Sequence, residues 1–312
     1  MRPGYRAFLS HSRSFLRSIS QQHHLVTASV MASKWPALND VERLSDRVIR
    51  ILAQNPNKFT LQGTNTYLVG TGPKRILIDT GEGRPQWFSI LQDVLASEKA
   101  TISQVLLTHY HLDHINGVKD VQTLNTPPEI YKHQPIKGWT DITNGQRFTT
   151  DDGKTTLKAF HCPGHTRDHM AYILEEEDAL FTGDNVLGHG TAVFEDLPLY
   201  IDSLNRMAEA AGGRGYPGHG EFLESAQTRI REYVAHRAQR EKEVVEVLGS
   251  KTESTGLGSM DIVKLIYQDT PENLHFAASR GVVQILEKLV AEGKVYHDDE
   301  ENTWALAKRA NL

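Results

Sequence analysis

The sequence predicts an α/β fold, and three observations support this prediction. Short apolar runs at residues 48–52, 66–69 and 75–79 have the length and composition of β-strands, and turn-forming residues separate them. Residues 85–98 carry apolar side chains at helical spacing, which predicts a helix that covers a sheet. The apolar run at residues 105–107 leads directly into a cluster of histidine and aspartate, as expected for a turn that leaves a buried strand.

The composition of the 312-residue chain is that of an ordinary globular protein with one large or two modest domains. Its net charge of −5 offers no basic surplus for nucleic acid. The single cysteine, Cys162, excludes a disulfide framework and suits a reducing compartment, so we expect it to be structural. No apolar run approaches the roughly 20 residues of a membrane span, so we expect a soluble protein with no membrane partner.

Residues 1–39 contain several arginines and serines but no acidic residue. This composition, with apolar residues on one helical face, is typical of a mitochondrial transit peptide. A disordered tail and initiation at Met31 are the alternatives. We therefore place residues 1–39 outside the fold as a leader. The expected location is the cytoplasm, or the mitochondrial matrix if the leader is a transit peptide.

The strands at residues 48–52, 66–69 and 75–79 are predicted to form a β-meander ahead of the histidine cluster. A turn that contains glycine and proline links the last two. Further along the chain, residues 151–153 predict a hairpin turn, and residues 155–160 predict the strand that follows it.

Two helices are predicted after these strands. Phe194 and residues 197–207 suggest the first, and residues 222–248 suggest a long, charged second helix. We expect the charged side chains of this second segment to form a solvated face rather than a binding patch: Glu221, Glu224, Arg229, Arg231, Glu232, Arg237, Arg240 and Glu241.

The C-terminal region has its own pattern. Residues 249–258 are polar and glycine-rich, which is typical of a linker. Beyond them, residues 260–267 and 277–292 predict two helices, and residues 293–296 and 303–306 predict a short hairpin. Acidic side chains outnumber basic ones here, whereas a phosphate-binding surface should be basic. We therefore expect this module to pack against the rest of the protein and frame a substrate.

The strongest functional signal is the run Thr-His-Tyr-His-Leu-Asp-His at residues 108–114. On an extended turn, His109 and His111 can present ring nitrogens to one metal ion, while Asp113 and His114 are displaced toward a second. Neutral imidazole and carboxylate are ordinary zinc ligands. A solvated polar loop is the alternative for such a run.

Four ligands cannot complete two metal sites, and the chain supplies three further candidates. His165, Asp184 and His219 each follow an apolar segment and stand next to a glycine, which permits a tight turn with the backbone close to an ion. Together these seven residues account for two ions, which argues against the solvated-loop alternative.

This signature, followed by Gly117, resembles that of the metallo-β-lactamase superfamily. The resemblance implies an αββα sandwich with two zinc ions at one edge. It assigns the seven ligands to two ions: His109, His111 and His165 to the first, Asp113, His114 and His219 to the second, and Asp184 to both. It also implies that Asp79, at the end of a strand, supports the site, although a simple turn aspartate is the alternative.

The C-terminal helices and hairpin resemble a winged helix, as found in the β-lactamase-like protein 2 family. The predicted organisation is then a leader at residues 1–39, a metallo-β-lactamase domain at residues 40–249 and a winged-helix-like domain at residues 250–312.

Two branches of the superfamily are similar to the whole chain, and both share residues 57–67. Residues 181–197 look closer to fungal lactamase-like thioesterases, which release aromatic polyketides from the acyl carrier protein of a polyketide synthase. The leader and the winged helix fit a mitochondrial, single-strand-specific endoribonuclease of the β-lactamase-like protein 2 type, for which RNA would be the partner. A glyoxalase-II-like hydrolase of small-molecule thioesters is a second alternative. A non-enzymatic role would require a degraded site.

The resemblance implies that the thioesterase and the ribonuclease share one chemistry and differ only in the electrophile, which is a thioester or RNA. Water held by two zinc ions ionises near pH 7, and the hydroxide is the expected nucleophile. Asp113 is the expected catalytic residue, as proton acceptor and then donor. A thiol with a pKa of about 8.5 leaves more easily than the alkoxide of RNA, and the net charge of −5 favours the thioester. Manganese or iron could replace zinc in such a site.

Further polar residues lie close to the ligands in the sequence. His189 stands on a glycine-rich loop, where it could line the pocket or face solvent. Tyr110, His161 and His169 are expected to frame the site, without assigned roles.

Overall fold

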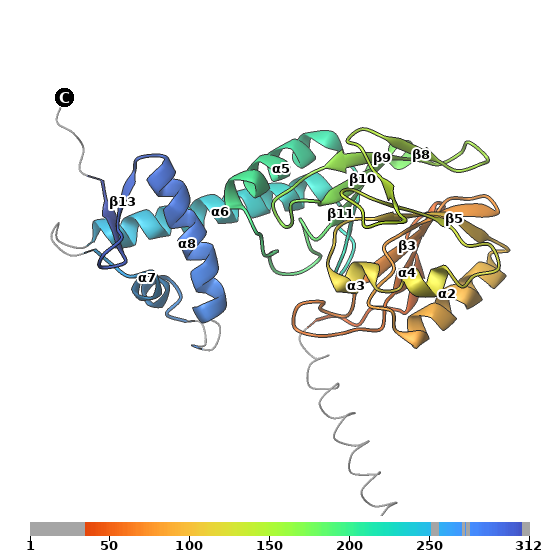
Figure 1. Cartoon of the computed structure of the whole chain (residues 1–312), viewed down its shortest axis with the longest axis horizontal. Coiled ribbons are helices and arrows are strands. Elements are labelled where there is room, and N and C mark those ends of the chain that lie inside the picture. The colour runs from red at the N-terminus through yellow and green to blue at the C-terminus, as the bar shows by residue number, and fades with distance from the viewer. Residues whose placement is uncertain (1–34, 251–255, 270–271, 273–274, 308–312) are drawn as a thin grey trace, which may run out of the picture.

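The computed structural model describes residues 35–250, 256–269, 272 and 275–307. Most of the predicted leader and residues 251–255 of the predicted linker lie outside these ranges. Two β-sheets pack face to face in the larger part of the chain, and a smaller helical unit stands beside them (Figure 1). No helix among the described residues combines the length and the hydropathy needed to cross a membrane.

The first sheet has seven strands in chain order. They are β1 (Val41–Arg43), β2 (Val48–Leu52), β3 (Asn65–Val69), β4 (Lys74–Ile78), β5 (Thr101–Leu107), β6 (Glu129–Lys132) and β7 (Thr140–Asp141). Strands β1 to β4 pair antiparallel, which confirms the meander, and β4 to β7 pair parallel. Residues 85–98, which separate β4 from β5, therefore make the crossover that parallel strands require.

The second sheet has five strands. Their order is β12 (Gly215–Pro217), β11 (Ala179–Gly183), β10 (Met170–Leu174), β9 (Thr156–His161) and β8 (Arg147–Thr149). The pairing is antiparallel except between β11 and β12. The core between the sheets takes alternate residues from both, such as Ile76 and Ile78 of β4 against Tyr172 and Phe181.

Helices cover the outer faces of both sheets. Leu77 and Leu107 point away from the inter-sheet core and pack with Trp87 and Leu91 of α2 (Pro85–Ser97). The second sheet is covered by α5 (Leu197–Ala210) and α6 (Ala226–Gly249). Two short helices, α3 (Leu112–Ile115) and α4 (Val118–Val121), follow β5. These layers are the expected αββα sandwich.

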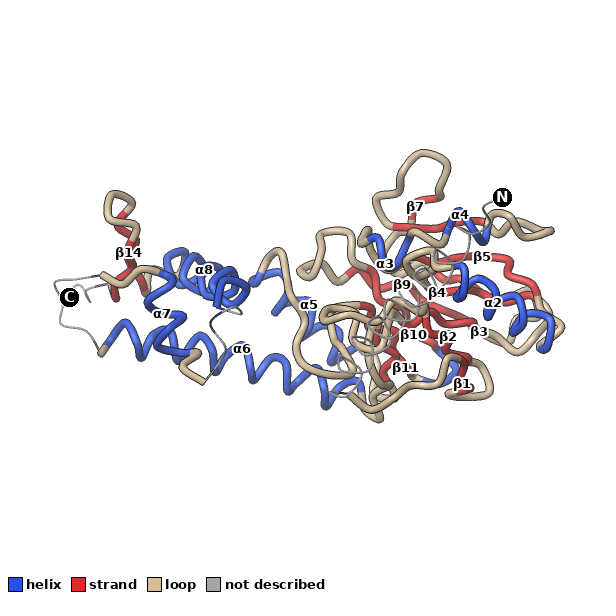
Figure 2. The backbone as a smooth tube through the Cα atoms, turned by 90° about the horizontal axis from the view of Figure 1, so that it is seen from below, coloured by secondary structure: helices blue, strands red, loops and turns tan. Residues whose placement is uncertain are grey.

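The C-terminal unit consists of α7 (Ser259–Ile266), α8 (His275–Ala291) and the hairpin of β13 (Val295–Asp298) and β14 (Thr303–Leu306). Its core includes Val244 and Leu248 of α6. Helix α6 therefore belongs to both parts of the molecule, and it extends from the sandwich into the C-terminal unit (Figure 2).

The structure corrects several predicted elements. Strand β1 precedes the segment that we expected to be the first strand; it is a three-residue edge strand with exposed side chains, so it has no apolar pattern. Helix α5 excludes Phe194, because Asp196 caps it by accepting from Leu199 N at 3.0 Å. Helix α6 begins at Ala226, after the cap Ser225, and not at residue 222.

The predicted solvated face of α6 is partly wrong. Arg240 lies 4.5 Å from the ring centroid of Tyr267, and Glu241 accepts from Lys288 of α8 at 2.8 Å. Arg229 and Arg237 donate to backbone carbonyls of the loop before α5. These side chains were misassigned because their partners are distant in sequence.

Candidate metal centre

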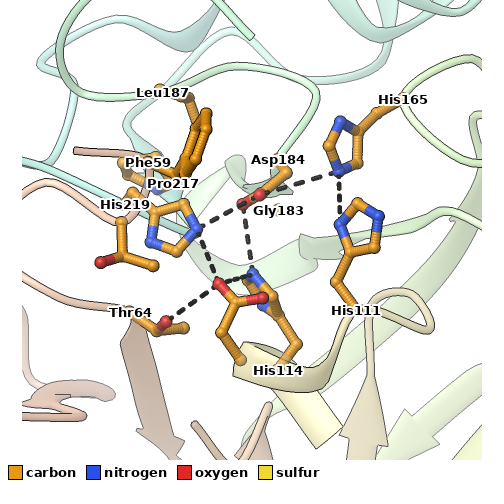
Figure 3. Close-up of polar contacts among 12 residues, drawn as sticks. Phe59, Thr64, His111, His114, His165, Gly183, Asp184, Leu187, Pro217 and His219 are labelled. Carbon is orange, nitrogen blue, oxygen red and sulfur yellow. Dashed lines mark hydrogen bonds and ion pairs between the residues drawn. The ribbon is translucent and has the colours of Figure 1, made fainter. Parts of the chain in front are cut away.

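The seven predicted ligand side chains converge at one edge of the sandwich. Figure 3 labels five of them: His111, His114, His165, Asp184 and His219. His109 and His111 follow β5, and Asp113 and His114 stand on α3. The loops after β9, β11 and β12 carry the other three: His165, Asp184 and His219. The two sheets thus bring together residues that are up to about a hundred positions apart. They form two groups, each of which could hold a metal ion.

The first group consists of His109, His111, His165 and Asp184. His111 Nδ1 lies 3.0 Å from His109 Nε2 and 3.1 Å from His165 Nε2, and His165 Nε2 lies 3.7 Å from Asp184 Oδ2. Nitrogens that bind one zinc ion tetrahedrally at about 2.0–2.1 Å stand about 3.3 Å apart. The observed spacing is therefore close to that of ligands around one ion.

The second group consists of Asp113, His114 and His219, with Asp184 beside it. His219 Nε2 lies 3.3 Å from Asp113 Oδ2 and 3.2 Å from Asp184 Oδ2. His114 Nε2 lies 3.5 Å from Asp113 Oδ2 and 3.5 Å from Asp184 Oδ1. His114 Nε2 and Asp184 Oδ1 are buried without a hydrogen-bond partner among the described residues, so a metal ion would satisfy both.

The imidazoles are oriented by hydrogen bonds from their outer nitrogens. Four of the five direct Nδ1 to an oxygen outside the two groups: His109 to Thr108 Oγ1 at 2.9 Å, His114 to Asp79 Oδ2 at 2.7 Å, His165 to Val193 O at 2.8 Å and His219 to Gly63 O at 3.4 Å. A ring that donates its Nδ1–H keeps the lone pair of Nε2 for a metal. These partners therefore select the tautomer with the proton on Nδ1, which is the tautomer that a metal ion bound at Nε2 requires.

Asp79 supports two of the candidate ligands. It is buried, and its backbone adopts the left-handed conformation, with φ of 57°. Oδ1 accepts from Thr108 N at 2.8 Å, and Oδ2 accepts from Thr108 Oγ1 at 2.8 Å and from His114 Nδ1. Through Thr108, this carboxylate also orients His109. These contacts exclude the alternative of a simple turn aspartate.

Burial and the neighbouring charges separate the histidines into two classes. Burial lowers the pKa of His109 and of His111, so both rings are neutral at pH 7. Burial also opposes charge on His114 and His219, but the carboxylates beside them outweigh it. The pKa of His114 is raised well above its ordinary value, and that of His219 is raised to about 9.

The carboxylates show the complementary shifts. Burial opposes the ionisation of Asp113 and Asp184, but the His114 and His219 rings outweigh it. The pKa of Asp113 is lowered to about 2, and that of Asp184 is held well below its usual range. Both are therefore available as anionic ligands at neutral pH.

Two glycines allow the backbone to approach the site. A Cβ atom at Gly218 would lie 2.2 Å from Asp184 Oδ1, and one at Gly164 would lie 2.3 Å from the Cα atom of Tyr200 in α5. Gly164 also has a φ of +137°, which disfavours other residues. These two glycines thus allow the backbone to approach Asp184 and α5 closely.

A pocket of about 410 Å³ opens over the candidate ligands. Its walls come from residues 58–61 and 187–193, and Phe59 and Val193 remain 67% and 66% exposed at its mouth. His189 lines it, stacked on Trp35 with ring centroids 4.7 Å apart. Of the two alternatives for His189, the pocket position is therefore the one observed. Trp35 falls within residues 1–39, which we had excluded as leader.

Sequence reasoning left His169 without a role, and the structure provides one. His169 is buried, and its Nε2 accepts from Asp184 N at 3.1 Å, so it holds the backbone of a candidate ligand. Its Nδ1 lies 3.3 Å from Cys162 Sγ. Burial raises the pKa of Cys162 to about 12, so this residue remains a thiol. The proximity of His169 to His165 in the sequence was the one available signal.

The comparisons with known proteins agree with this geometry. Residues 59–235 match the family model described as Metallo-beta-lactamase superfamily, and residues 258–304 match that of the Beta-lactamase associated winged helix domain. Lactamase-like protein ptaB of Pestalotiopsis fici is 44% identical over 279 residues, which are 86% of this chain and 88% of that protein. The protein of Passalora fulva named Atrochrysone carboxyl ACP thioesterase is 43% identical over 270 residues, 83% of this chain and 80% of its own.

A solved structure extends the comparison of the fold. The beta-lactamase domain protein from Burkholderia ambifaria superimposes with a TM-score of 0.72 at 17% identity, covering 88% of this chain and 95% of that one. At this identity the likeness concerns the fold alone. The predicted fold class, a metallo-β-lactamase sandwich with a C-terminal winged helix, is confirmed.

Metal binding should release protons near neutral pH. Without metal, His114 and His219 are protonated at pH 7 because their pKa values are raised, to about 9 for His219. A metal ion at Nε2 displaces these protons, so affinity should rise by up to about tenfold per pH unit for each proton, and the contribution of His219 should level off above about pH 9. Titration calorimetry in buffers of different ionisation enthalpy measures the release. Binding without proton release would contradict this expectation.

Replacing Asp79 should weaken metal binding. In Asp79→Asn, an amide NH₂ would face the Nδ1–H of His114 or the hydroxyl of Thr108, so one of these groups would lose its acceptor. We expect metal affinity to fall about 10- to 100-fold, as measured by competition with a chromophoric chelator. Asp93→Asn, on the exposed face of α2, is the matched control. Equal affinities of the two variants would show that Asp79 does not orient the ligands.

Proposed function

Because the chain belongs to the metallo-beta-lactamase superfamily, we propose that it cleaves an acyl thioester carried by an acyl carrier protein, using two zinc ions. It is a metal-dependent hydrolase. Relatives named Atrochrysone carboxyl ACP thioesterase support a role in polyketide biosynthesis. The observation that carries the proposal is a pair of His/Asp groups in contact through Asp184, at the floor of a pocket with apolar walls.

The proposed ligands follow the two groups of the structure. His109, His111 and His165 would hold the first zinc ion, Asp113, His114 and His219 the second, and Asp184 both. Imidazole nitrogen and carboxylate oxygen suit zinc, although manganese and iron also accept this set. The orientation of four rings through Nδ1 supports their role as ligands.

The pocket suits an acyl group better than a nucleotide. Phe59, Leu61, Leu187 and Val193 contribute apolar surface to its walls. Lys58 is the single Lys or Arg among the described residues that line it. Apolar walls around a few convergent polar groups are typical of small-molecule sites, whereas a phosphate backbone needs several cations.

The residues of this chain provide proton transfer and orientation. Bound zinc ions would supply an activated water and polarise the thioester carbonyl. Asp113 is ionised, since its pKa is about 2, and Thr64 Oγ1 donates to its Oδ2 at 3.4 Å. It can take a proton from the attacking water and pass it to the departing sulfur. A thiol of pKa about 8.5 needs little of this assistance.

The second candidate is an endoribonuclease, which the winged-helix domain favours. In this chain, however, the turn between β13 and β14 carries Asp298, Asp299, Glu300 and Glu301. Asp299 pairs with His297 at 2.9 Å. Such a surface repels phosphate, so we rank this function below the thioesterase.

A side-by-side turnover assay tests the proposal. The zinc-loaded full chain should hydrolyse an aryl-acyl thioester on a carrier protein and leave single-stranded RNA intact, while His111→Ala should lose activity by at least about 100-fold and remain folded. An acyl glutathione thioester should be a poorer substrate than the carrier-bound one. RNA cleavage that is lost in His111→Ala would establish the ribonuclease instead, and preference for the glutathione thioester a glyoxalase-like hydrolase.

Asp113→Asn separates proton transfer from substrate binding. The amide cannot accept the proton, so kcat should fall by about 10²- to 10⁴-fold while KM changes little. Steady-state kinetics at matched zinc occupancy provides both constants. A rise in KM with an unchanged kcat would remove Asp113 from the proton transfer.

A further inference from the structure

The loop that forms one wall of the pocket is held from outside the metal centre. We call residues 188–196 the pocket loop; they connect the candidate ligand Asp184 and the residues after it to α5. Residues 189–193 line the pocket. Glu195 N and Asp196 N donate to Gly164 O at 2.7 and 3.2 Å. The loop therefore contacts the residue before His165 as well as the substrate space.

Side chains from three other elements donate to the carbonyls of the pocket loop. The pairs are Arg229 with Gly190 O at 3.0 Å, Arg237 with Ala192 O at 2.7 Å, His165 with Val193 O at 2.8 Å and Gln284 with Phe194 O at 3.2 Å. Three of these carbonyls are consecutive. One of them orients a candidate metal ligand, and the carbonyls on either side of it are held by α6 and α8.

Gln284 is the link to the C-terminal unit. Its Nε2 donates to Phe194 O, and its Oε1 accepts from Leu197 N at 2.9 Å, one of the free N–H groups at the start of α5. The backbone partners fix the amide, because exchanging its oxygen and nitrogen would oppose both bonds. Gln284 therefore connects α8 to both the pocket loop and α5.

Phe194 reinforces this link. Its ring packs with buried residues of the second sheet's core and also with those of the C-terminal core. The guanidinium of Arg237 lies 4.7 Å from the centroid of the same ring. Phe194 is thus anchored to two cores, next to Val193, which lines the pocket and is exposed.

We propose that Gln284 and Arg237 are positioning residues of the hydrolytic site. They hold Ala192 and Phe194 so that the carbonyl between them meets His165 and the loop side chains form the pocket wall. The C-terminal unit is then part of the hydrolytic site rather than a nucleic-acid module. The inference rests on the proposed function for its kinetic consequences, but the position of the loop can be measured without any substrate.

The test compares Gln284→Met with Gln239→Met in the full chain. Methionine matches the length of glutamine but removes the donor and the acceptor, and Gln239 is an exposed residue of α6 whose side chain bonds only to Glu243 in the described contacts. In Gln284→Met we expect amide hydrogen exchange of residues 188–196 to accelerate about tenfold, and zinc affinity to fall about tenfold, because His165 loses a fixed partner. The control should match the unmodified chain.

Kinetics distinguish positioning from general destabilisation. Loss of the pocket wall should raise KM for the carrier-bound thioester by about fivefold, with kcat within about twofold, whereas partial unfolding would lower the apparent kcat alone. Arg237→Lys should change amide exchange, zinc affinity and KM in the same direction as Gln284→Met, since lysine retains the charge but not the guanidinium plane. Arg231→Lys, on the exposed face of α6, is its control.

Two outcomes overturn the inference. Exchange and zinc affinity of Gln284→Met equal to those of Gln239→Met would show that the C-terminal unit does not position the loop, even if thioester hydrolysis is normal. If Gln284→Met does not fold, Gln284→Glu provides the test, because it keeps the acceptor for Leu197 N but sets a carboxylate oxygen against Phe194 O in place of the donor. An unchanged loop in that variant would overturn the inference too. Inactivity of the unmodified chain toward thioesters refutes the proposed function alone, since exchange and zinc affinity still report on the loop.

Discussion

The structure depends on compensating the polar groups that two sheets bury at one edge. Asp184 is at the centre: its carboxylate lies within 3.7 Å of ring nitrogens of His114, His165 and His219. A buried carboxylate is stable only with such partners, and the partners themselves need outer acceptors. Asp79 and backbone carbonyls serve as those acceptors. The edge of the sandwich is therefore a continuous network in which each group orients the next, and metal ions would complete it.

The sandwich architecture makes this network possible. Strands β5, β11 and β12 end at the same edge, so short loops after them reach a common centre. These loops can come this close only where no side chain intervenes. A side chain at Gly164 would collide with α5, and one at Gly218 would collide with Asp184. His169 is fully buried, and its ring holds Asp184 by accepting from the backbone N–H of that residue.

The C-terminal unit has a structural role at this site that its fold alone does not reveal. A winged helix is often associated with nucleic acid, but here its helix α8 contacts the start of α5 and the pocket loop, and its core is completed by α6. The N-terminal half of α6 packs against the second sheet, and its C-terminal half packs against the C-terminal unit. Four of the charged residues that we expected to be solvated make tertiary contacts instead: Arg229 and Arg237 hold the pocket loop, and Arg240 and Glu241 contact the C-terminal unit.

The sequence by itself predicted the strands at residues 48–52, 66–69, 75–79, 105–107 and 155–160 and the seven side chains that meet at one edge, because apolar periodicity and ligand spacing are local properties; the sandwich followed from the resemblance. It did not reveal β1, β6, β7 or β10, nor the helix starts, which caps decide. Only the tertiary structure decided the partners of those ligands: the Val193 carbonyl, the ring of Trp35 in the pocket, and the amide of Gln284. The physical reason is that a carbonyl or a glutamine carries no chemical signature in a sequence, and acquires a role only when folding places it within hydrogen-bond distance of another chain segment.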